Sequence, residues 1–220
     1  MSLEGVAVKT SRERYRAQMC AEIKRYAWEQ LGTTGLSALS LNAIAKHVGM
    51  SGPALYRYFP SRDDLITDLV RDAYRSLADV VRAAAGSGGV AEVAYAIRDW
   101  ALADPQRYLF VYGTPIPGYR APGDTTEISN EIMAVLLRVH AEAPDDGRAT
   151  AFDGHVEEHR DWAGGLPVSS AVLRRAVTFW TRIHGVLSLE LAGHFAGMGF
   201  DPGVLFAAEL TSLSTKDDSR

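Results

Sequence analysis

Residues 41–60 read LNAIAKHVGMSGPALYRYFP, and this stretch decides how the first part of the chain folds. Leu41, Ile44 and Val48 recur at the i, i+3, i+7 spacing of one face of a short helix. Gly49 follows them, and glycine adopts the positive φ of a tight turn without a steric cost. The pattern therefore predicts a short helix that ends in a sharp bend.

A second short helix is expected after the bend, beginning behind Ser51 and ending before Pro60. Leu55 and Phe59 share the side of this helix that would face a common core. Two short helices around a tight turn, with the small residue Ala45 where they cross, are typical of a helix-turn-helix. An ordinary helical hairpin is the alternative. The side opposite the core carries small and polar residues with two tyrosines on its flanks: Pro53, Ala54 and Arg57, then Tyr56 and Tyr58.

Charge is divided unevenly along the chain. Residues 1–62 hold nine Lys and Arg but four Asp and Glu, a formal charge of +5, whereas the remaining residues carry −9. A basic head on an acidic body favours binding of a polyanion such as DNA, because clustered cations attract phosphates. A solvated basic helix face would give the same count.

Apolar residues recur at helical spacing along the rest of the chain, and no long segment alternates with period two. We therefore expect an all-α fold with two domains. An N-terminal three-helix, helix-turn-helix DNA-binding domain is expected at residues 11–60, and a C-terminal helical domain at residues 76–215. Helices are expected near residues 10–32, 61–85, 90–103, 105–112, 124–142, 168–196 and 202–213.

Residues 143–167 contain Pro, Gly and Asp with little apolar content, so we expect them to form a mobile surface loop. At the front of the long connecting helix, Ser61 and Asp64 have the spacing of a capping box.

Composition excludes several classes of protein. No apolar run approaches the roughly 18–20 residues that cross a bilayer, and the N-terminus lacks the apolar segment of a secretory signal. Cys20 is the one cysteine in the sequence, so neither a disulfide within the chain nor a multi-cysteine metal site is expected. These features indicate a soluble, cytoplasmic protein without a membrane partner.

Several motifs resemble the N-terminal domain of the tetracycline-repressor (TetR) family over about residues 11–75. They are LSLNAIA at 39–45, VGMS at 48–51, LYRYFPSR at 55–62 and Asp64-Leu65. The resemblance implies a homodimeric transcriptional regulator, most often a repressor. It implies binding to a palindromic operator in double-stranded DNA and release when a small-molecule effector enters the C-terminal domain.

Carried over onto this sequence, the family's operator-contacting positions form one set. Many members have a basic residue where Asn42 and Gly52 stand here, so base readout is expected to rest more on Arg57 and on the backbone. Three arginines before the first apolar stripe (Arg12, Arg14 and Arg16) offer further phosphate contacts or a solvated extension. The implied DNA-binding residues are Ser40, Leu41, Asn42, Gly52, Pro53, Ala54, Tyr56, Arg57 and Arg62.

The C-terminal part resembles one subgroup of the family, through DWALADP at 99–105 and a Trp-His-Gly motif of Trp180, His184 and Gly185. Aromatic residues between helices would suit a largely apolar ligand of unknown identity, although such residues also build ordinary cores. The candidate ligand-binding residues are Tyr95, Trp100, Tyr108, Phe110, Tyr112, Phe179, Trp180 and His184.

Residues 171–195 are apolar on nearly every face, which predicts cover from both their own domain and another chain. Together with residues 202–213, this segment would supply two helices per subunit to a four-helix interface of a homodimer. Burial within a monomer is the alternative.

Two other functions stay open. His155, Glu158 and His159 match an H-x-x-E-H zinc pattern, which would make the chain a metal-dependent hydrolase, but we expect them in an exposed loop. The chain would alternatively be a scaffold that binds DNA without sequence preference. We expect no enzyme activity, no cofactor and no metal; the sequence identifies neither the effector nor the operator.

Overall fold

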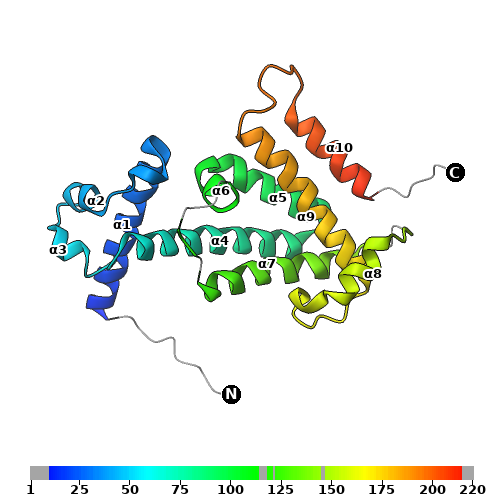
Figure 1. The fold of residues 1–220 in the computed structure, drawn as a ribbon, viewed down its shortest axis with the longest axis horizontal. Helices are drawn as coiled ribbons and strands as arrows, with labels where there is room; N and C mark the ends of the chain where they lie inside the picture. The colour runs from blue at the N-terminus through cyan, green and yellow to red at the C-terminus, as the bar shows by residue number, and fades with distance from the viewer. Residues whose placement is uncertain (1–9, 114–117, 121, 145–146, 215–220) are drawn as a thin grey trace. The chain divides into compact units, whose positions relative to one another are not determined.

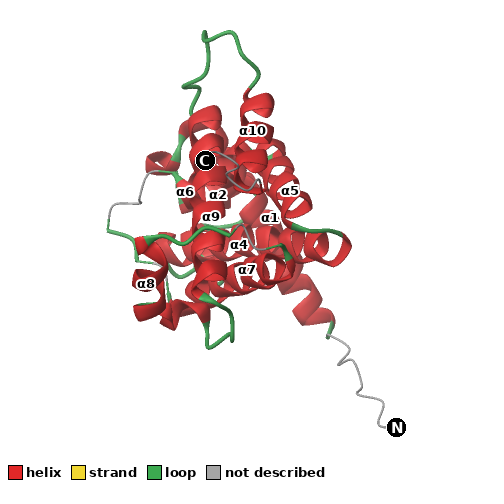
Figure 2. Ribbon diagram, turned by 90° about the vertical axis from the view of Figure 1, so that its right-hand side faces the viewer, coloured by secondary structure: helices red, strands yellow, loops and turns green. Residues whose placement is uncertain are grey.

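The computed structural model describes residues 10–113, 118–120, 122–144 and 147–214 of the chain. It divides into two compact units, Met1–Leu69 and Val70–Arg220, and the boundary falls inside one long helix, α4 (Arg62–Ser87). The described residues form helices and loops without a strand, as Figures 1 and 2 show. The expected all-α class is therefore confirmed.

The first unit is built on a long helix and two short ones. Thr10 and Glu13 cap the long helix reciprocally, through Glu13 N to Thr10 Oγ1 at 3.2 Å and Thr10 N to Glu13 Oε2 at 2.7 Å. Ile23, Ile44 and Leu55 are fully buried and form the common core of the three helices. The elements are α1 (Ser11–Thr34), η1 (Leu36–Ala38), α2 (Leu41–His47), α3 (Gly52–Leu55) and the beginning of α4.

The second unit is organised around α9, which packs against α5, α6, α7, α8 and α10 (Figure 1). Its core contains the fully buried side chains of Ile97, Tyr108, Phe179 and Phe206. The elements after α4 are α5 (Val90–Ala103), α6 (Pro105–Tyr112), α7 (Gly123–Glu142), α8 (Ala151–Glu158), η2 (Arg160–Ala163), α9 (Ser170–Leu191) and α10 (Pro202–Ser214).

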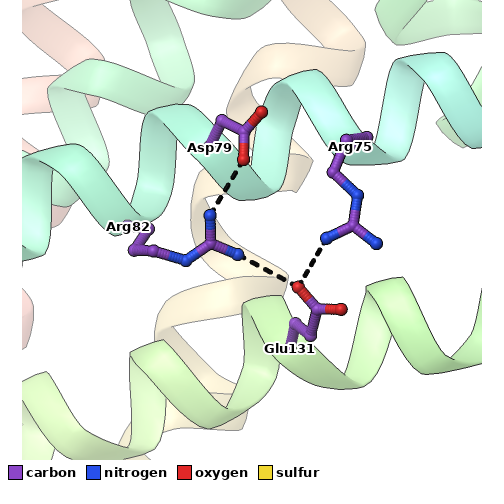
Figure 3. A network of polar contacts seen from close by, with 4 residues as sticks. All are labelled: Arg75, Asp79, Arg82 and Glu131. Carbon is purple, nitrogen blue, oxygen red and sulfur yellow. Dashed lines mark hydrogen bonds and ion pairs between the residues drawn. The ribbon is translucent and has the colours of Figure 1, made fainter. Parts of the chain in front are cut away.

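Exposed ion pairs join α4 to α7 in the second unit (Figure 3). Glu131 of α7 accepts from Arg75 at 2.7 Å and from Arg82 at 3.0 Å, and Arg82 also reaches Asp79 at 2.8 Å. Because these side chains are well exposed, water and salt screen the pairs, so we expect each pair to contribute little to stability.

Residues 143–167 differ from the loop that the sequence predicts, because they contain α8 and η2. Asp153 caps α8 through the backbone N of Thr150 at 2.6 Å, and it accepts from Arg174 Nε of α9 at 2.9 Å. Val156 and Ala163 are buried against α7 and α9. Contacts with residues distant in sequence therefore fold a segment of weak local pattern.

The predicted end of α9 at residue 196 is also wrong, since the helix ends at Leu191. Gly193 has a φ of 77° and donates to Glu190 O at 2.9 Å, while His194 N donates to Leu189 O at 2.9 Å. This is the hydrogen-bond pattern of a Schellman cap, for which glycine provides the left-handed residue.

Candidate nucleic-acid interface and ligand site

The turn between α2 and α3 has the geometry that the sequence predicts. Ser40 Oγ accepts from Ala43 N at 3.3 Å and caps α2, and Met50 N donates to Ala45 O at 2.8 Å across the bend. Gly49 has a φ of 69°, and nothing lies within 4 Å of where its Cβ would be. Backbone conformation, not lack of space, therefore requires glycine there.

The outer face of α3 is exposed and its inner face is buried. Leu55 and Phe59 lie in the core, whereas Pro53, Tyr56 and Arg57 are exposed. The α-helix is shorter than expected, ending at Leu55, and the chain continues to Tyr58 as a turn. The segment thus presents a small N-terminal edge followed by a tyrosine and an arginine.

The remaining implied DNA contacts fall into two groups. Asn42 is exposed beside Gly52, whose Cβ position would lie 3.4 Å from Asn42 Oδ1, and Ser40 and Ala54 are half-buried. Leu41 and Arg62 instead serve the unit itself, because Leu41 is buried and Arg62 donates to two carbonyl oxygens. Those acceptors are Leu39 O at 3.2 Å and Leu36 O at 2.6 Å.

Arg16 of α1 contacts the turn that follows α3. Its guanidinium donates to Arg57 O at 3.3 and 3.4 Å and lies over the ring of Tyr58, 5.2 Å from the centroid. Arg12 and Arg14 are exposed on the first turn of α1. Sequence reasoning grouped the three arginines as possible phosphate contacts and did not find this contact, because it joins residues 41 positions apart.

In the second unit, four of the eight candidate ligand residues meet in one aromatic cluster, formed by Tyr108, Tyr112, Trp180 and His184. The rings of Trp180 and His184 are 4.0 Å apart between centroids, and those of Tyr112 and His184 are 4.4 Å apart. Trp100 meets Tyr108 edge-on at 6.4 Å. The Trp-His-Gly motif therefore lies against α6.

Buried polar groups accompany these rings. Tyr108 Oη lies 3.0 Å from His184 Nδ1 and 2.9 Å from Ser188 Oγ. Among the described residues, Tyr112 Oη and His184 Nε2 are buried without a hydrogen-bond partner. Burial lowers the pKa of His184 to about 4 and raises the pKa of Tyr112 above its ordinary value.

The other three candidates have different surroundings. Tyr95 is exposed and contacts Phe206 of α10 at 5.8 Å between centroids. Phe179 is fully buried and meets His140 of α7 at 5.2 Å. Phe110 is half-buried on α6. The sequence alone does not show which of these rings contact one another.

A cavity of about 550 Å³ lies between the start of α5, the end of α7 and the middle of α9. None of the eight candidate residues lines it. Its basic residues come from α9 and from the segment before α8, and they are not among the candidate ligand residues predicted from the sequence. Burial and, less strongly, the charge of Arg175 lower the pKa of His140 to about 4. The basic lining residues are Arg148, Arg174, Arg175 and Arg182.

Most of these basic groups already bind the protein. Arg174 is buried and pairs with Asp153, while Arg175 donates to His140 O at 3.0 Å and to Pro144 O. Arg182 donates to Ser212 Oγ at 2.6 Å. The cavity thus has both apolar and cationic walls, and the hydrogen bonds of its cations are largely directed into the protein.

His155 and Glu158 lie in the last turn of α8, and His159 is the residue that directly follows this helix. All three are exposed, and the atoms that each offers to a metal lie within 4.8 Å of one another. The expectation of a loop is therefore wrong. Whether these three side chains bind a metal ion is a separate question.

None of the helices in the described part of the chain has the length and apolarity that a bilayer-spanning segment needs.

Two family models match the sequence. Residues 24–69 match the bacterial regulatory proteins of the tetR family, and residues 90–213 match the tetracyclin repressor-like C-terminal domain.

Similar proteins and structures agree with these matches. The HTH-type transcriptional regulators Rv1816 of Mycobacterium tuberculosis and Mb1846 of Mycobacterium bovis are each 35% identical over 215 residues, covering 90% of this chain and 92% of theirs. The crystal structure of the regulatory protein SCO4313 is 61% identical, with a TM-score of 0.87, and covers 93% of this chain and 98% of that one. A tetR family regulator from Shewanella sp. PV-4, 14% identical with a TM-score of 0.59 over 89% of this chain and 95% of that one, shares the fold.

Proposed function

The chain belongs to the tetR family of bacterial regulatory proteins, and from this premise we propose that it is a repressor released from a palindromic operator by a small molecule. One observation carries the proposal: α3 and the turn after it expose Pro53, Tyr56 and Arg57, while Leu55 and Phe59 are buried in the core. A short helix with an exposed small edge suits the major groove of DNA. Because the proposed operator is part of the bacterial chromosome, the proposed function implies a cytoplasmic protein.

The exposed residues of this face have separate roles in the proposed complex. Pro53 and Gly52 let the backbone approach the base edges, and Arg57 reads guanine or neutralises a phosphate. Tyr56 donates its hydroxyl to a phosphate, and Asn42 contacts DNA beside Gly52. Ser40 and Ala54 complete the docking surface at its edges.

Two implied contacts take a modified form in this proposal. Leu41 is buried, so its backbone and not its side chain faces the DNA. Arg62 holds η1 by two hydrogen bonds to carbonyl oxygens, so it positions the interface. Arg16 acts in the same way on the carbonyl of Arg57.

A palindromic operator requires a homodimer with one DNA-binding face in each copy. Leu189 on α9 and Val204 on α10 are 45% and 67% exposed in the single chain, which leaves apolar surface for a second copy. Two copies related by a two-fold axis would present two α3 faces to two half-sites. Analytical ultracentrifugation of the full chain should therefore find a dimer, and a monomer at micromolar concentration would contradict this part of the proposal.

We propose that the effector contacts the side chains of the aromatic cluster. We also propose that it contacts the helices that carry the other predicted ligand residues, which are Tyr95, Trp100, Phe110 and Phe179. Tyr112 Oη and His184 Nε2 support this site, because each is a buried polar atom that a ligand can satisfy on entering. The cavity beside Arg175 is the competing location, since its volume suits a small molecule.

DNA binding is tested with the region upstream of the protein's own gene, in competition with random DNA at fixed salt. We expect the upstream DNA to bind more tightly. The double variant Tyr56→Ala, Arg57→Ala should lose at least 10-fold in affinity, because each bidentate base contact provides about 1–3 kcal/mol. Lys46→Ala, on the exposed side of α2, is the matched control for the loss of one cation.

Each outcome of this competition distinguishes a function. Equal binding of both DNAs would favour a scaffold without sequence preference. Unchanged affinity in the double variant would show that α3 does not read the operator. Transcription from the upstream promoter, measured with and without the protein, separates a repressor from an activator.

The effector site is tested by a thermal-shift screen of small molecules on the full chain, because a ligand of the folded state raises the melting temperature. For any compound that releases operator DNA, we expect His184→Gln and Trp180→Ala to reduce the shift. Arg182→Gln, in the cavity wall, should keep it. The reverse result would move the effector to the cavity.

A further inference from the structure

The last turn of α8 gathers three side chains that can each donate a lone pair to a metal ion. His155 and His159 are four residues apart, and their ring centroids are 4.4 Å apart. Glu158 lies beside them, and the possible ligand atoms of all three lie within 4.8 Å of one another. The proposed regulator function uses none of these residues.

One hydrogen bond already prepares His159 for coordination. Its Nδ1 lies 2.9 Å from the carbonyl oxygen of His155, and a carbonyl can only accept. In the neutral ring the proton is therefore on Nδ1, which leaves the lone pair on Nε2 for a ligand. Histidines that bind metals commonly donate their other ring nitrogen to a carbonyl or carboxylate in this way.

We propose that His155, Glu158 and His159 bind one transition-metal ion of the zinc class, with water in the fourth position. Two imidazole nitrogens and one carboxylate oxygen form a ligand set that zinc accepts in tetrahedral geometry. At metal–ligand distances of about 2.0–2.2 Å and tetrahedral angles, two ligands of one ion lie about 3.3–3.6 Å apart. The ligand atoms, which lie within 4.8 Å of one another, therefore need to approach by on the order of 1 Å, and the exposure of the side chains allows such rotations.

The position of the site gives the ion a structural effect. Asp153 anchors the front of α8 through Thr150 and Arg174, whereas the proposed site lies at its other end. An ion bound by Glu158 and by His159, the residue that follows the helix, would hold its last turn closed. Binding would thus stabilise α8 where it packs on α9, independently of whether the chain binds DNA.

The test uses the full chain without a purification tag, because a histidine tag would bind the same ions. Calorimetric titration with Zn²⁺ should give one site per chain, and Co²⁺ should show the absorption bands of tetrahedral coordination. His155→Ala and His159→Ala should each weaken Zn²⁺ binding at least 10-fold, and Glu158→Gln should weaken it less. His194→Ala removes another exposed histidine, in the turn after α9, and should leave binding unchanged.

Two results would overturn the site. One is absence of a Zn²⁺ site in the wild-type chain. The other is equal affinity in the wild type and the double variant His155→Ala, His159→Ala. Circular dichroism of each variant shows that a loss of binding is not a loss of helix, and Zn²⁺ should raise the melting temperature of the wild type but not of the double variant.

Discussion

The two units place their candidate functional groups differently with respect to their cores. In the first unit, the side chains of Tyr56 and Arg57 are exposed, so we expect DNA binding to be separable from folding. In the second unit, Tyr108 and Phe179 are fully buried and belong to the core. Any ligand that reaches this aromatic cluster must therefore displace packing that also stabilises the unit.

The sharpest test of this difference compares two tyrosines. Tyr108→Ala should lower the free energy of unfolding of the second unit by roughly 3–5 kcal/mol, because it removes a buried ring and leaves a cavity. Tyr56→Ala should change stability by less than about 0.5 kcal/mol, as expected for a surface position. Urea denaturation measures both. Similar losses in the two variants would refute the distinction between the units.

Acid should act on the second unit through its two buried histidines. Their pKa values are about 4 in the folded protein, whereas an unfolded histidine titrates near 6.5. The unfolded chain therefore takes up protons first, so the stability due to neutral burial is complete above pH 6.5 and is lost as the pH falls to 4. For His184 the loss is roughly 3 kcal/mol over this window.

Replacing His184 by Gln isolates its contribution from those of the carboxylates. The variant should lose less stability than the wild type between pH 7 and pH 4.5 when both are unfolded in urea. An identical pH dependence in the two proteins would mean that His184 is not neutral through burial. The same comparison with His140→Gln tests the second group.

The bend of the first unit provides a smaller effect. Gly49→Ala should destabilise the unit by roughly 1–2 kcal/mol, the cost of a left-handed conformation for a residue with a Cβ. Gly86→Ala on α4 is the matched control, because space is also open around its Cβ position but its φ is not positive. That change should stabilise by up to about 1 kcal/mol. Thermal unfolding measures the change in stability of both variants. Changes of the same sign would show that the positive φ of Gly49 does not determine the effect.

The smallest effect is expected at the exposed network of Figure 3. Glu131→Gln removes one charge shared by Arg75 and Arg82, and it should cost less than about 1 kcal/mol. The cost should shrink further in molar salt, because ions screen exposed charges. A larger, salt-independent loss would show that Glu131 is effectively buried.

The sequence predicts the fold well where the signals are local. Ser40 caps α2, Gly49 forms the bend, and Ser61 pairs with Asp64 before α4, all by contacts within a few residues. Residues 143–167 were predicted wrongly because α8 depends on Arg174 and on buried contacts with α7 and α9, which no local pattern contains.

The candidate sites follow the same division. The exposed face of α3 could be read from helical spacing, because Leu55 and Phe59 determine which side is left for DNA. Spacing also placed Tyr108, Trp180 and His184 on inner faces, but it does not show which rings meet or where a cavity lies. That depends on how helices distant in sequence pack, as the cavity beside Arg175 illustrates.

The hydroxyl of Tyr108 can serve its neighbours in two ways without any heavy atom moving. It either donates to His184 Nδ1 and accepts from Ser188, or accepts from His184 Nδ1 and donates to Ser188. Each choice moves the single imidazole proton to the opposite nitrogen and so inverts the polarity that Nε2 offers. The buried imidazole of the aromatic cluster can thereby act as either donor or acceptor at Nε2, and ¹⁵N shifts of this ring would report which form a bound molecule selects.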